Sequence, residues 1–449
     1  MKLEVAIPQD FSAERGYAVQ VLLEHFLGLE VDMQIRPAIK DYLIQVPGGK
    51  KLIIQDHFFG SVNENEGYLH SKYLPKAAAL TDWETDFSEA VIIFGNNYFT
   101  QTPELTVCGL DLFASAFFML TRWEEAVKEE RDQHQRFPAE AAFALQQNFL
   151  HRPVVDEYVD LLKQLLTDAG YQGKFKQGKF ELIPTHDVDH IRYWKSERQM
   201  KRQLGGDIVK RLNPLLAVNT FTEYRKVTKG KIKDPFDTFD WLMEQSEKQG
   251  LQSRFYFIAG GETEHEGNYD IHDERVKTLI QRIKERGHLI GIHPSYDTYL
   301  DVEVLKKEKE TLEKVAGQEI TEGRQHYLRF SVPETWQNWE EAGLKLDSSM
   351  NYAGYEGFRC GTGREFPVFN IKTGKKLNLL ERPLILMDTN PVIHNFNNIN
   401  KNYREVNAYF IGQAQGYQMP LTVLFHNSVF AMYKKHQLQA AYEDLLSKI

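Results

Sequence analysis

The sequence predicts an α/β protein in two parts: a smaller α/β region, residues 1–175, followed by a parallel sheet or barrel, residues 176–449. Three observations lead to this expectation. The chain has 449 residues, which is enough for more than one hydrophobic core. Short apolar runs alternate with helical patterns through the second part, as in parallel sheets with helical crossovers. A polar, glycine-containing stretch, residues 168–179, marks the boundary between the parts.

Composition is that of a soluble globular protein, with 42% hydrophobic and 26% charged residues. No apolar run approaches the roughly 18 residues of a membrane-spanning helix. The first eight residues lack the apolar core and cleavage site of a signal peptide. Two cysteines, Cys108 and Cys360, are too few for a disulfide framework, so we expect a reducing, cytoplasmic setting. The net charge of −9 argues against a nucleic-acid partner.

The first part contains short strand patterns and longer helical ones. Strands are expected at Leu3–Ile7, Tyr42–Val46, Lys51–Ile54 and Ala90–Phe94, and helices at Tyr17–Leu27, Leu110–Val127 and Val155–Leu166. Asp111–Glu125 is apolar on nearly all sides, which predicts a buried helix. His134, His151 and Asp156 have no ligand-like spacing, and we interpret them as structural.

The second part alternates strands and helices more regularly. The expected strands are Phe180–Thr185, Ser253–Ile258, His288–Ile292, Gln325–Arg329, Leu344–Asp347, Leu377–Leu380 and Leu421–Phe425. The helices expected between them include Phe239–Gln249, Asp273–Arg286 and Val302–Val315. In a barrel of this kind, chemistry takes place at the carboxyl ends of the strands.

One segment, at about residues 192–233, interrupts this alternation with 12 lysines and arginines against three acidic residues. It contains an apolar island, Leu212–Val218, followed by Phe221 and Tyr224. One interpretation is a solvated helical insertion between the first two strands. The other is a surface that docks on anionic lipid or on a pyrophosphate-linked glycan.

Two aspartates, Asp187 and Asp189, close the first strand of the second part. At a spacing of i, i+2 on a strand, both carboxylates point to the same face. Like charges this close are costly unless a cation lies between them or one carboxylate holds a proton. Metal sites and acid/base sites have this arrangement, although a turn or a helix cap can also contain the pattern.

Three other strands end in groups that would complete a metal site. His293 closes an apolar strand, and Asp297 would return to it if Pro294 opens a helical turn. The segment Arg324–Arg329 is polar for an interior strand, and His426 closes the last apolar strand. These residues together favour a functional site.

In this order the motifs resemble those of the NodB-type polysaccharide deacetylases. The matching segments are Thr185–Asp189, Gly287–His293, Leu328-Arg329 with Pro333, and Leu424–His426. The resemblance covers roughly residues 176–430 and implies a distorted (β/α) barrel that removes N- or O-acetyl groups from sugars with the help of a metal. The whole chain is also similar to bacterial proteins in which an uncharacterised α/β domain precedes a divergent deacetylase domain, often encoded with surface-polysaccharide genes.

The resemblance also implies a metal-binding set. Asp187 matches the catalytic base, Asp189 the first metal ligand, and His293 the first histidine of a His-x-x-x-His pair. The second histidine of that pair falls on Asp297, which departs from the family pattern. A carboxylate can bind the same metals, or the site can recruit His326 instead.

The remaining roles fall on the later motifs. Arg329 best matches the substrate-site arginine, with Arg324 as the second choice, and His426 matches the general acid. The carboxylate that orients this histidine is one of three candidates, Asp347, Glu381 and Asp388.

The expected function is therefore a metal-dependent deacetylase that acts on an acetylated sugar linked to a nucleotide or a lipid. The metal is a divalent ion, with zinc expected and cobalt, manganese or iron as alternatives. A catalytically inert glycan-binding or scaffold protein on the same barrel is the main rival, which Asp297 favours. A metal hydrolase acting on a non-sugar amide is a third possibility.

Overall fold

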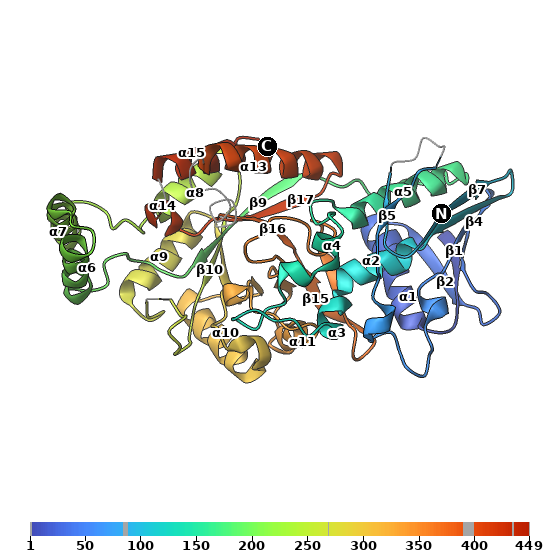
Figure 1. Cartoon of the computed structure of the whole chain (residues 1–449), viewed down its shortest axis with the longest axis horizontal. Coiled ribbons are helices and arrows are strands. Elements are labelled where there is room, and N and C mark those ends of the chain that lie inside the picture. Colours follow the sequence, from blue (N-terminus) through green and yellow to red (C-terminus); the bar gives the residue numbers. More distant parts are fainter. Residues whose placement is uncertain (1, 84–88, 268, 389–398, 433–434, 449) are drawn as a thin grey trace.

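The computed structural model describes residues 2–83, 89–267, 269–388, 399–432 and 435–448. In Figure 1 the described chain forms an elongated molecule with three parts along its length. A six-stranded sheet lies at the N-terminal end, a nine-stranded sheet lies in the middle, and a pair of helices projects at the far end. Among the described residues, none of the helices combines the length and hydropathy needed to cross a lipid bilayer.

The N-terminal sheet has the strand order β2-β1-β3-β4-β8-β7. Its strands are β1 (Lys2–Ile7), β2 (Glu30–Ile35), β3 (Tyr42–Gln45), β4 (Lys51–Ile54), β7 (Gly95–Gln101) and β8 (Leu105–Leu110). The helices of this part are α1 (Ser12–Val19), continued by a π-helix over Gln20–Phe26, then α2 (Leu112–Thr121), α3 (Trp123–Val127), α4 (Phe143–Gln146) and α5 (Val154–Asp168). Strands β5 (Ala79–Leu80) and β6 (Val91–Ile92) form a separate ladder.

All ten residues of α2 are buried, as the sequence predicts. Its N-terminus is capped by Asp111, whose Oδ1 accepts a hydrogen bond from the N–H of Ala114 at 3.1 Å. The predicted single helix over Leu110–Val127 is two helices, because Arg122 adopts a left-handed conformation with φ of 52°. Its buried guanidinium binds Glu124 and Glu125 at 2.6 and 2.9 Å.

The nine-stranded sheet has the order β14-β15-β13-β12-β11-β10-β9-β17-β16, and only the β14–β15 pair in it is antiparallel. Its strands are β9 (Glu181–Val188), β10 (Arg254–Phe257), β11 (Leu289–Ile292), β12 (Glu322–Gly323), β13 (Leu346–Asp347), β14 (Phe366–Asn370), β15 (Lys375–Glu381), β16 (Leu384–Met387) and β17 (Pro420–Leu424).

This sheet curls into a distorted barrel. Strand β15 pairs with β13, and β16 pairs with β17 at the other end of the sheet. Only Arg382 and Pro383 separate β15 from β16, so one run of chain joins the two ends. The ladders of β12 and β13 are only two residues long, which makes the barrel irregular. The predicted fold class, a distorted (β/α) barrel preceded by a smaller α/β region, is therefore confirmed.

Helices connect several barrel strands at the expected places. They are α8 (Phe239–Lys248), α9 (Glu274–Glu285), α10 (Val302–Ala316), α11 (Glu334–Glu341) and α13 (Ile399–Gly416), with α14 (Val429–Met432) and α15 (Lys435–Leu446) after the last strand. The predicted strand Gln325–Arg329 is wrong. The strand there is β12, and His326–Leu328 form a helical turn in which Tyr327 has φ of 60°. The buried side chains of this segment bind neighbouring loops, so its polarity reflects those contacts and not a strand.

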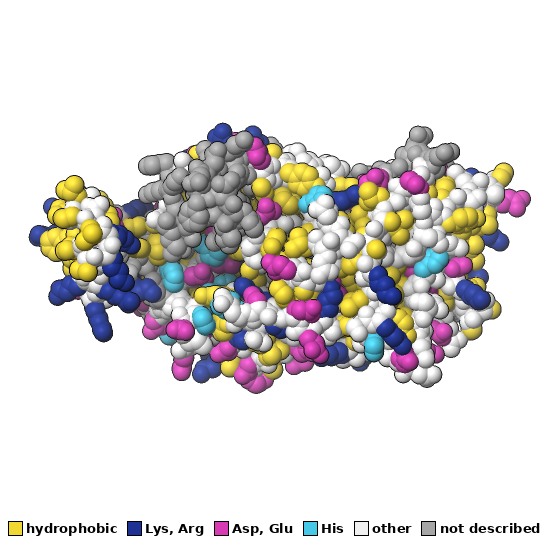
Figure 2. Space-filling model, in the orientation of Figure 1, with side chains coloured by type: hydrophobic (Ala, Val, Ile, Leu, Met, Phe, Trp, Pro, Cys, Tyr) yellow, Lys and Arg dark blue, Asp and Glu magenta, His cyan; other side chains and the backbone are white. Residues whose placement is uncertain are grey.

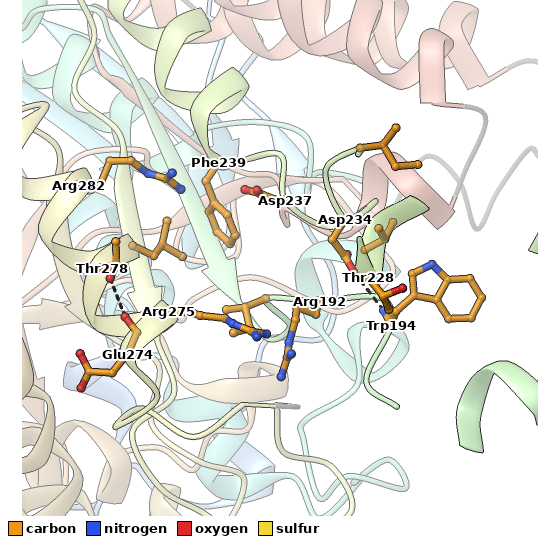
Figure 3. Close-up of a pocket in the computed structure, with 14 residues that line it drawn as sticks. Arg192, Trp194, Thr228, Asp234, Asp237, Phe239, Glu274, Arg275, Thr278 and Arg282 are labelled. Carbon is orange, nitrogen blue, oxygen red and sulfur yellow. Dashed lines mark hydrogen bonds between the residues drawn. The ribbon is translucent and has the colours of Figure 1, made fainter. Parts of the chain in front are cut away.

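The basic segment forms a hairpin of two helices, α6 (Glu197–Val209) and α7 (Pro214–Thr228), which projects between β9 and β10 (Figure 1). In Figure 2 hydrophobic surface gathers on part of this hairpin, and lysine and arginine side chains border it. A cavity of about 630 Å³ lies at the root of the hairpin, between residues 191–194, residues 227–239 and α9. Figure 3 shows Arg192, Arg275 and Phe239 among the side chains that line it.

The N-terminal part and the barrel share one hydrophobic core. The Tyr17 hydroxyl donates a hydrogen bond to the carbonyl of Pro367 in β14 at 2.8 Å. The Tyr17 ring packs on Phe369, with 4.9 Å between ring centroids, and Phe117 of α2 packs on the same ring. Strand β14 is therefore covered by helices of the first part.

Candidate metal centre and active site

The candidate residues come from the carboxyl ends of neighbouring parallel strands. Asp187 lies near the end of β9 and Asp189 directly follows it, while His293 directly follows β11. His326 lies three residues beyond β12, and His426 lies two residues beyond β17. Because these strands are neighbours and parallel, their carboxyl ends meet on one face of the barrel.

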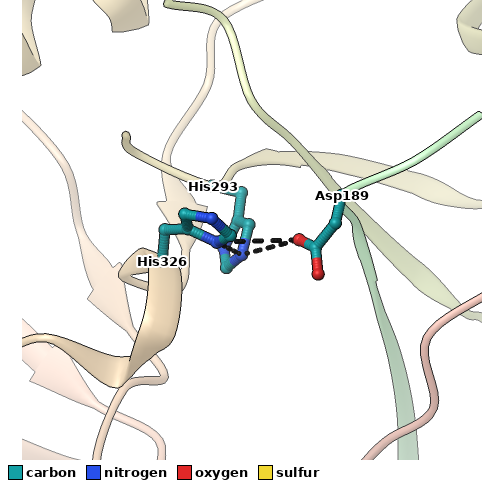
Figure 4. A group of neighbouring side chains, drawn as sticks. All are labelled: Asp189, His293 and His326. Atoms are coloured by element: carbon teal, nitrogen blue, oxygen red, sulfur yellow. Dashed lines mark hydrogen bonds and ion pairs between the residues drawn. The ribbon is translucent and has the colours of Figure 1, made fainter. Parts of the chain in front are cut away.

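Three side chains, those of Asp189, His293 and His326, form a compact group (Figure 4). Asp189 Oδ1 lies 3.3 Å from His293 Nε2 and 3.6 Å from His326 Nδ1. The two ring nitrogens lie 2.9 Å apart. All three potential ligand atoms lie within 4.8 Å of one another.

The other nitrogen of each ring is held by a backbone carbonyl. His293 Nδ1 lies 2.6 Å from the carbonyl oxygen of Arg324, and His326 Nε2 lies 2.8 Å from that of His265. A carbonyl only accepts hydrogen bonds, so these nitrogens carry the protons and each ring turns a lone pair toward Asp189. Such bonds orient histidine ligands in metal sites.

The group has the electrostatic character of a cation site. Asp189 Oδ1 is buried and accepts no well-formed hydrogen bond, although two ring nitrogens face it. Two neutral lone pairs at 2.9 Å repel each other unless a proton or a cation lies between them. One carboxylate and two imidazoles are a ligand set that binds zinc and similar divalent metals. The three residues therefore fit a divalent metal.

Burial and charge act differently on the two rings. Burial lowers the pKa of His326 to about 4, so this ring is neutral at physiological pH. Burial also opposes a charge on His293, but the nearby carboxylates of Asp187 and Asp189 outweigh it and raise its pKa. Burial opposes the ionised form of Asp189, but His293 and the other ring nitrogens beside this carboxyl outweigh burial and lower its pKa.

Asp187 lies beside this group and is held by a partner of its own, Arg324. The buried guanidinium of Arg324 donates a hydrogen bond from Nη1 to Asp187 Oδ1 at 2.8 Å. The same nitrogen binds Thr185 Oγ1, and Arg324 Nε binds the carbonyl of Ser348. Asp187 Oδ2 remains 3.8 Å from His293 Nε2. The carboxylate is thus fixed at one oxygen, while the other faces the cluster.

His426 approaches the group from the opposite side. Its Nε2 lies 3.6 Å from Asp189 Oδ2, and its Nδ1 lies 3.0 Å from Asp388 Oδ1. Asp388 Oδ2 also accepts the backbone N–H of His426 at 2.5 Å. Burial opposes protonation, but the carboxylates of Asp388, Asp189 and Asp187 outweigh it and raise the pKa of His426 to about 10. Asp388 is therefore the carboxylate that orients this ring.

The other two candidate orienters form a separate buried pair. Asp347 and Glu381 are fully buried, and their carboxyl groups interact with each other. Burial raises the pKa of Asp347 to about 6 and that of Glu381 well above its usual value. Trp336 Nε1 donates to Glu381 at 3.0 Å, and the Ser349 hydroxyl donates to Asp347 at 2.5 Å. This pair has a structural role and does not touch His426.

The structure does not bring Asp297 or Arg329 to the cluster. Asp297 has a side chain that is 68% exposed, and its carboxylate accepts a hydrogen bond from Arg329 at 2.7 Å. The chain does turn after Pro294, with the N–H of Thr298 donating to the carbonyl of Ser295 at 3.1 Å and a 3-10 helix following over Thr298–Leu300, but the Asp297 side chain pairs with Arg329 and not with the cluster.

Arg329 ties two parts of the chain together. It lies between the rings of Tyr296 and Tyr299 and donates from Nε to the carbonyl of His134 at 3.0 Å. The structure therefore puts Arg324, and not Arg329, in contact with Asp187. It likewise groups His326, and not Asp297, with Asp189 and His293.

A cavity of about 540 Å³ opens over the group, lined by Asp187, Asp189, His293, His326 and His426 among others. Two basic side chains, Arg136 and Lys195, also line it. Lys195 belongs to the basic segment that the sequence marks, whereas sequence patterns gave no indication of Arg136. Arg136 belongs to the first part of the chain and reaches the site by donating to the carbonyl of Tyr327 at 2.8 Å. A local sequence motif cannot predict a contact between residues this far apart in the chain.

A protein-family model matches the N-terminal part of the chain. Residues 3–171 match the model of a family of unknown function (DUF7033). Comparison with curated proteins found no match.

Several solved structures are similar to about three fifths of this chain. A candidate polysaccharide deacetylase from Mycobacterium smegmatis is 15% identical, with 61% of this chain and 84% of that chain covered and a TM-score of 0.37. The allantoinase Puue is 13% identical over 60% and 84%, with a TM-score of 0.37. The chitin deacetylase of the fungal pathogen Colletotrichum lindemuthianum is 11% identical over 61% and 83%, with a TM-score of 0.33. Because these identities and TM-scores are low, the fold of this chain is assigned from its own strand order.

Proposed function

We propose that this chain is a metal-dependent hydrolase that removes an acetyl group from an N- or O-acetylated sugar, in the synthesis of a surface polysaccharide. One observation carries the proposal: three converging metal-ligand atoms share a cavity with a second carboxylate and an oriented histidine. Binding alone would need neither Asp187 beside the ligands nor the His426–Asp388 pair.

The ligand set for the metal is Asp189, His293 and His326. A divalent ion held there, with zinc expected, would supply Lewis-acid chemistry to the acetyl carbonyl and to a nucleophilic water. Arg324 and the two backbone carbonyls keep Asp187 and both rings in place.

Asp187 is the general base in this proposal. Its Oδ2 faces the cluster, while Arg324 holds Oδ1, so one oxygen is available to take a proton from water. His426 is the general acid. With a pKa of about 10 its ring is protonated at neutral pH, and Asp388 orients it to deliver a proton to the leaving amine or hydroxyl.

The substrate in this proposal carries an anionic group beside its acetylated sugar. Arg136 and Lys195 in the cavity wall suit the phosphate of a nucleotide- or lipid-linked sugar. We also propose a cytoplasmic location for the protein, which would fit such a substrate.

Metal analysis of the purified protein, combined with acetate release from nucleotide-linked, lipid-linked and free N-acetyl sugars, tests this function. We expect about one divalent ion per chain and acetate release that a chelator abolishes and zinc or cobalt restores. A chain that binds no metal and releases no acetate after zinc or cobalt is added would instead support the inert glycan-binding protein. Release from non-sugar amides alone would support another metal hydrolase.

A further inference from the structure

The end of the helical hairpin away from its root carries an apolar surface that neither the barrel nor the candidate site uses. Six large apolar side chains lie exposed in and beside the turn between α6 and α7: Ile208, Val209, Leu212, Leu215, Leu216 and Val218. We call these residues the hairpin tip. Val209, Leu212 and Leu215 are 73%, 80% and 77% exposed. Clusters of this kind in water mark a surface that binds a partner.

The hairpin does not need these side chains for its own packing. Met200, Ala217 and Thr220 are buried between its helices. The buried carboxylate of Asp207 accepts a hydrogen bond from the Thr220 hydroxyl at 2.8 Å and pairs with Arg211. The side chains of the tip can therefore move from water into another environment while the hairpin stays folded.

Basic side chains follow the hairpin from the turn at its tip to its root. Lys210 and Arg211 lie in the turn itself, and further exposed lysines and arginines follow along both helices and the exit segment: Arg198, Lys201, Arg202, Arg225, Lys226, Lys229 and Lys231. Of the three acidic residues in the segment, Asp207 is buried and Glu197 pairs with Lys201. The hairpin is thus strongly positive on a chain with a net charge of −9.

We propose that the hairpin tip docks on an anionic lipid bilayer. Exposed Val and Leu side chains at the tip, with a basic rim formed by Lys210 and Arg211 in the turn and by further Lys and Arg along both helices, match the boundary between acyl chains and negative headgroups. A second copy of the chain fits less well, because two hairpins face to face would bring their positive charges together. A nucleic acid would use the basic rim but leave the apolar tip exposed.

Docking would hold the candidate site close to the membrane. One carboxylate, that of Asp234, accepts the backbone N–H groups of Tyr193 and Trp194 at 2.7 and 3.2 Å and so joins the two ends of the hairpin. The next residue, Lys195, lines the cavity of the candidate site. A lipid-linked substrate follows from this position only if the proposed function holds, whereas docking itself does not depend on it.

Sedimentation with vesicles tests the docking without any assay of activity. The full chain is mixed with vesicles of phosphatidylcholine alone or with added phosphatidylglycerol. We expect binding to the anionic vesicles that weakens as salt rises, since screening acts on the basic rim. The variant V209Q/L212Q/L215Q should lose binding about tenfold or more, because three apolar side chains no longer enter the bilayer. Lys226→Glu with Lys229→Glu should weaken binding to anionic vesicles only.

A matched control, I35Q/L80Q/L300Q, removes three exposed apolar side chains away from the hairpin and should bind as the wild type does. Circular dichroism of each variant checks that the helices remain. The proposal is overturned if the wild type ignores anionic vesicles, or if the tip variant binds them as well as the wild type. It is also overturned if sedimentation equilibrium shows that the wild type is a dimer and the tip variant a monomer, and the wild type does not bind vesicles.

Discussion

Two pairs of acidic residues at the carboxyl ends of barrel strands solve the same electrostatic problem in different ways. The carboxyl groups of Asp347 and Glu381 interact with each other, and burial raises the pKa of both, so a shared proton removes their repulsion. Asp187 is paired with Arg324, while Asp189 faces two ring nitrogens. A proton held between the two carboxyls would satisfy the first pair, whereas the second leaves acceptor atoms from three residues converging on one point. What distinguishes a candidate site from a structural pair is that acceptor atoms of several residues converge with no donor between them, and not the presence of two carboxylates.

His293→Ala should have the largest effect, because it removes one of the three converging acceptors. We expect metal affinity to fall by more than about 100-fold, beyond the cost of losing an outer partner, together with acetate release. Metal content after dialysis and turnover are the measurements. Asp347→Asn serves as the control and should keep its metal. Full metal content in His293→Ala would show that the three atoms are not the ligand set.

Asp187→Asn should lower turnover without removing the metal. The amide keeps the size of the carboxylate but cannot take a proton, so turnover should fall roughly 10²–10⁴-fold while the metal remains bound. Metal content and the rate of acetate release are measured on the same preparation. A rate near that of the wild type would exclude Asp187 as the base.

Asp347→Asn should change stability and leave the site alone. The folded-state pKa of about 6 lies above the usual value of 3.8, so the folded protein holds this proton more tightly than the unfolded chain. This contribution is complete below about pH 4 and is lost as the pH rises through about 6, by up to about 3 kcal/mol. Asn cannot ionise, and its amide can donate to Glu381. The variant should therefore lose less stability than the wild type between pH 5 and pH 8 in urea unfolding. Equal losses in both proteins would contradict the shared proton.

Asp297→Asn should have the smallest effect. Its carboxylate is mostly exposed, so losing the pair with Arg329 should cost about 0–1 kcal/mol in the free energy of unfolding. Metal content should stay at the wild-type level. Loss of metal in this variant would return Asp297 to the ligand set and displace His326.

Much of the barrel can be predicted from its apolar strands, because β9, β11 and β17 are buried apolar runs that end in chemically distinctive residues. Strand β16 escapes prediction because only two residues separate it from β15, with no helix to mark the change of partner. Gln325–Arg329 misleads because tertiary contacts, and not strand pairing, explain its burial.

The candidate site is predictable only where a residue closes a strand. Asp187, Asp189, His293 and His426 do so, whereas Asp297 lies in a turn beyond its strand, where its carboxylate pairs with Arg329. Arg324 and Arg329 are both buried arginines five residues apart, and only the fold decides which one meets Asp187. Arg136 reaches the cavity across the two parts of the chain, a contact that local patterns cannot carry.

The shared core between the two parts has a consequence for the barrel as a separate unit. The buried Arg359 pairs with Glu125, and the partly buried Arg364 pairs with Asp156, so each joins a barrel residue to a carboxylate of the first part. A barrel produced without residues 1–175 would keep both arginines without these partners and would expose the apolar face of β14 to water. The first part therefore acts as a built-in folding partner of the barrel, and we expect the chain to unfold as one cooperative unit.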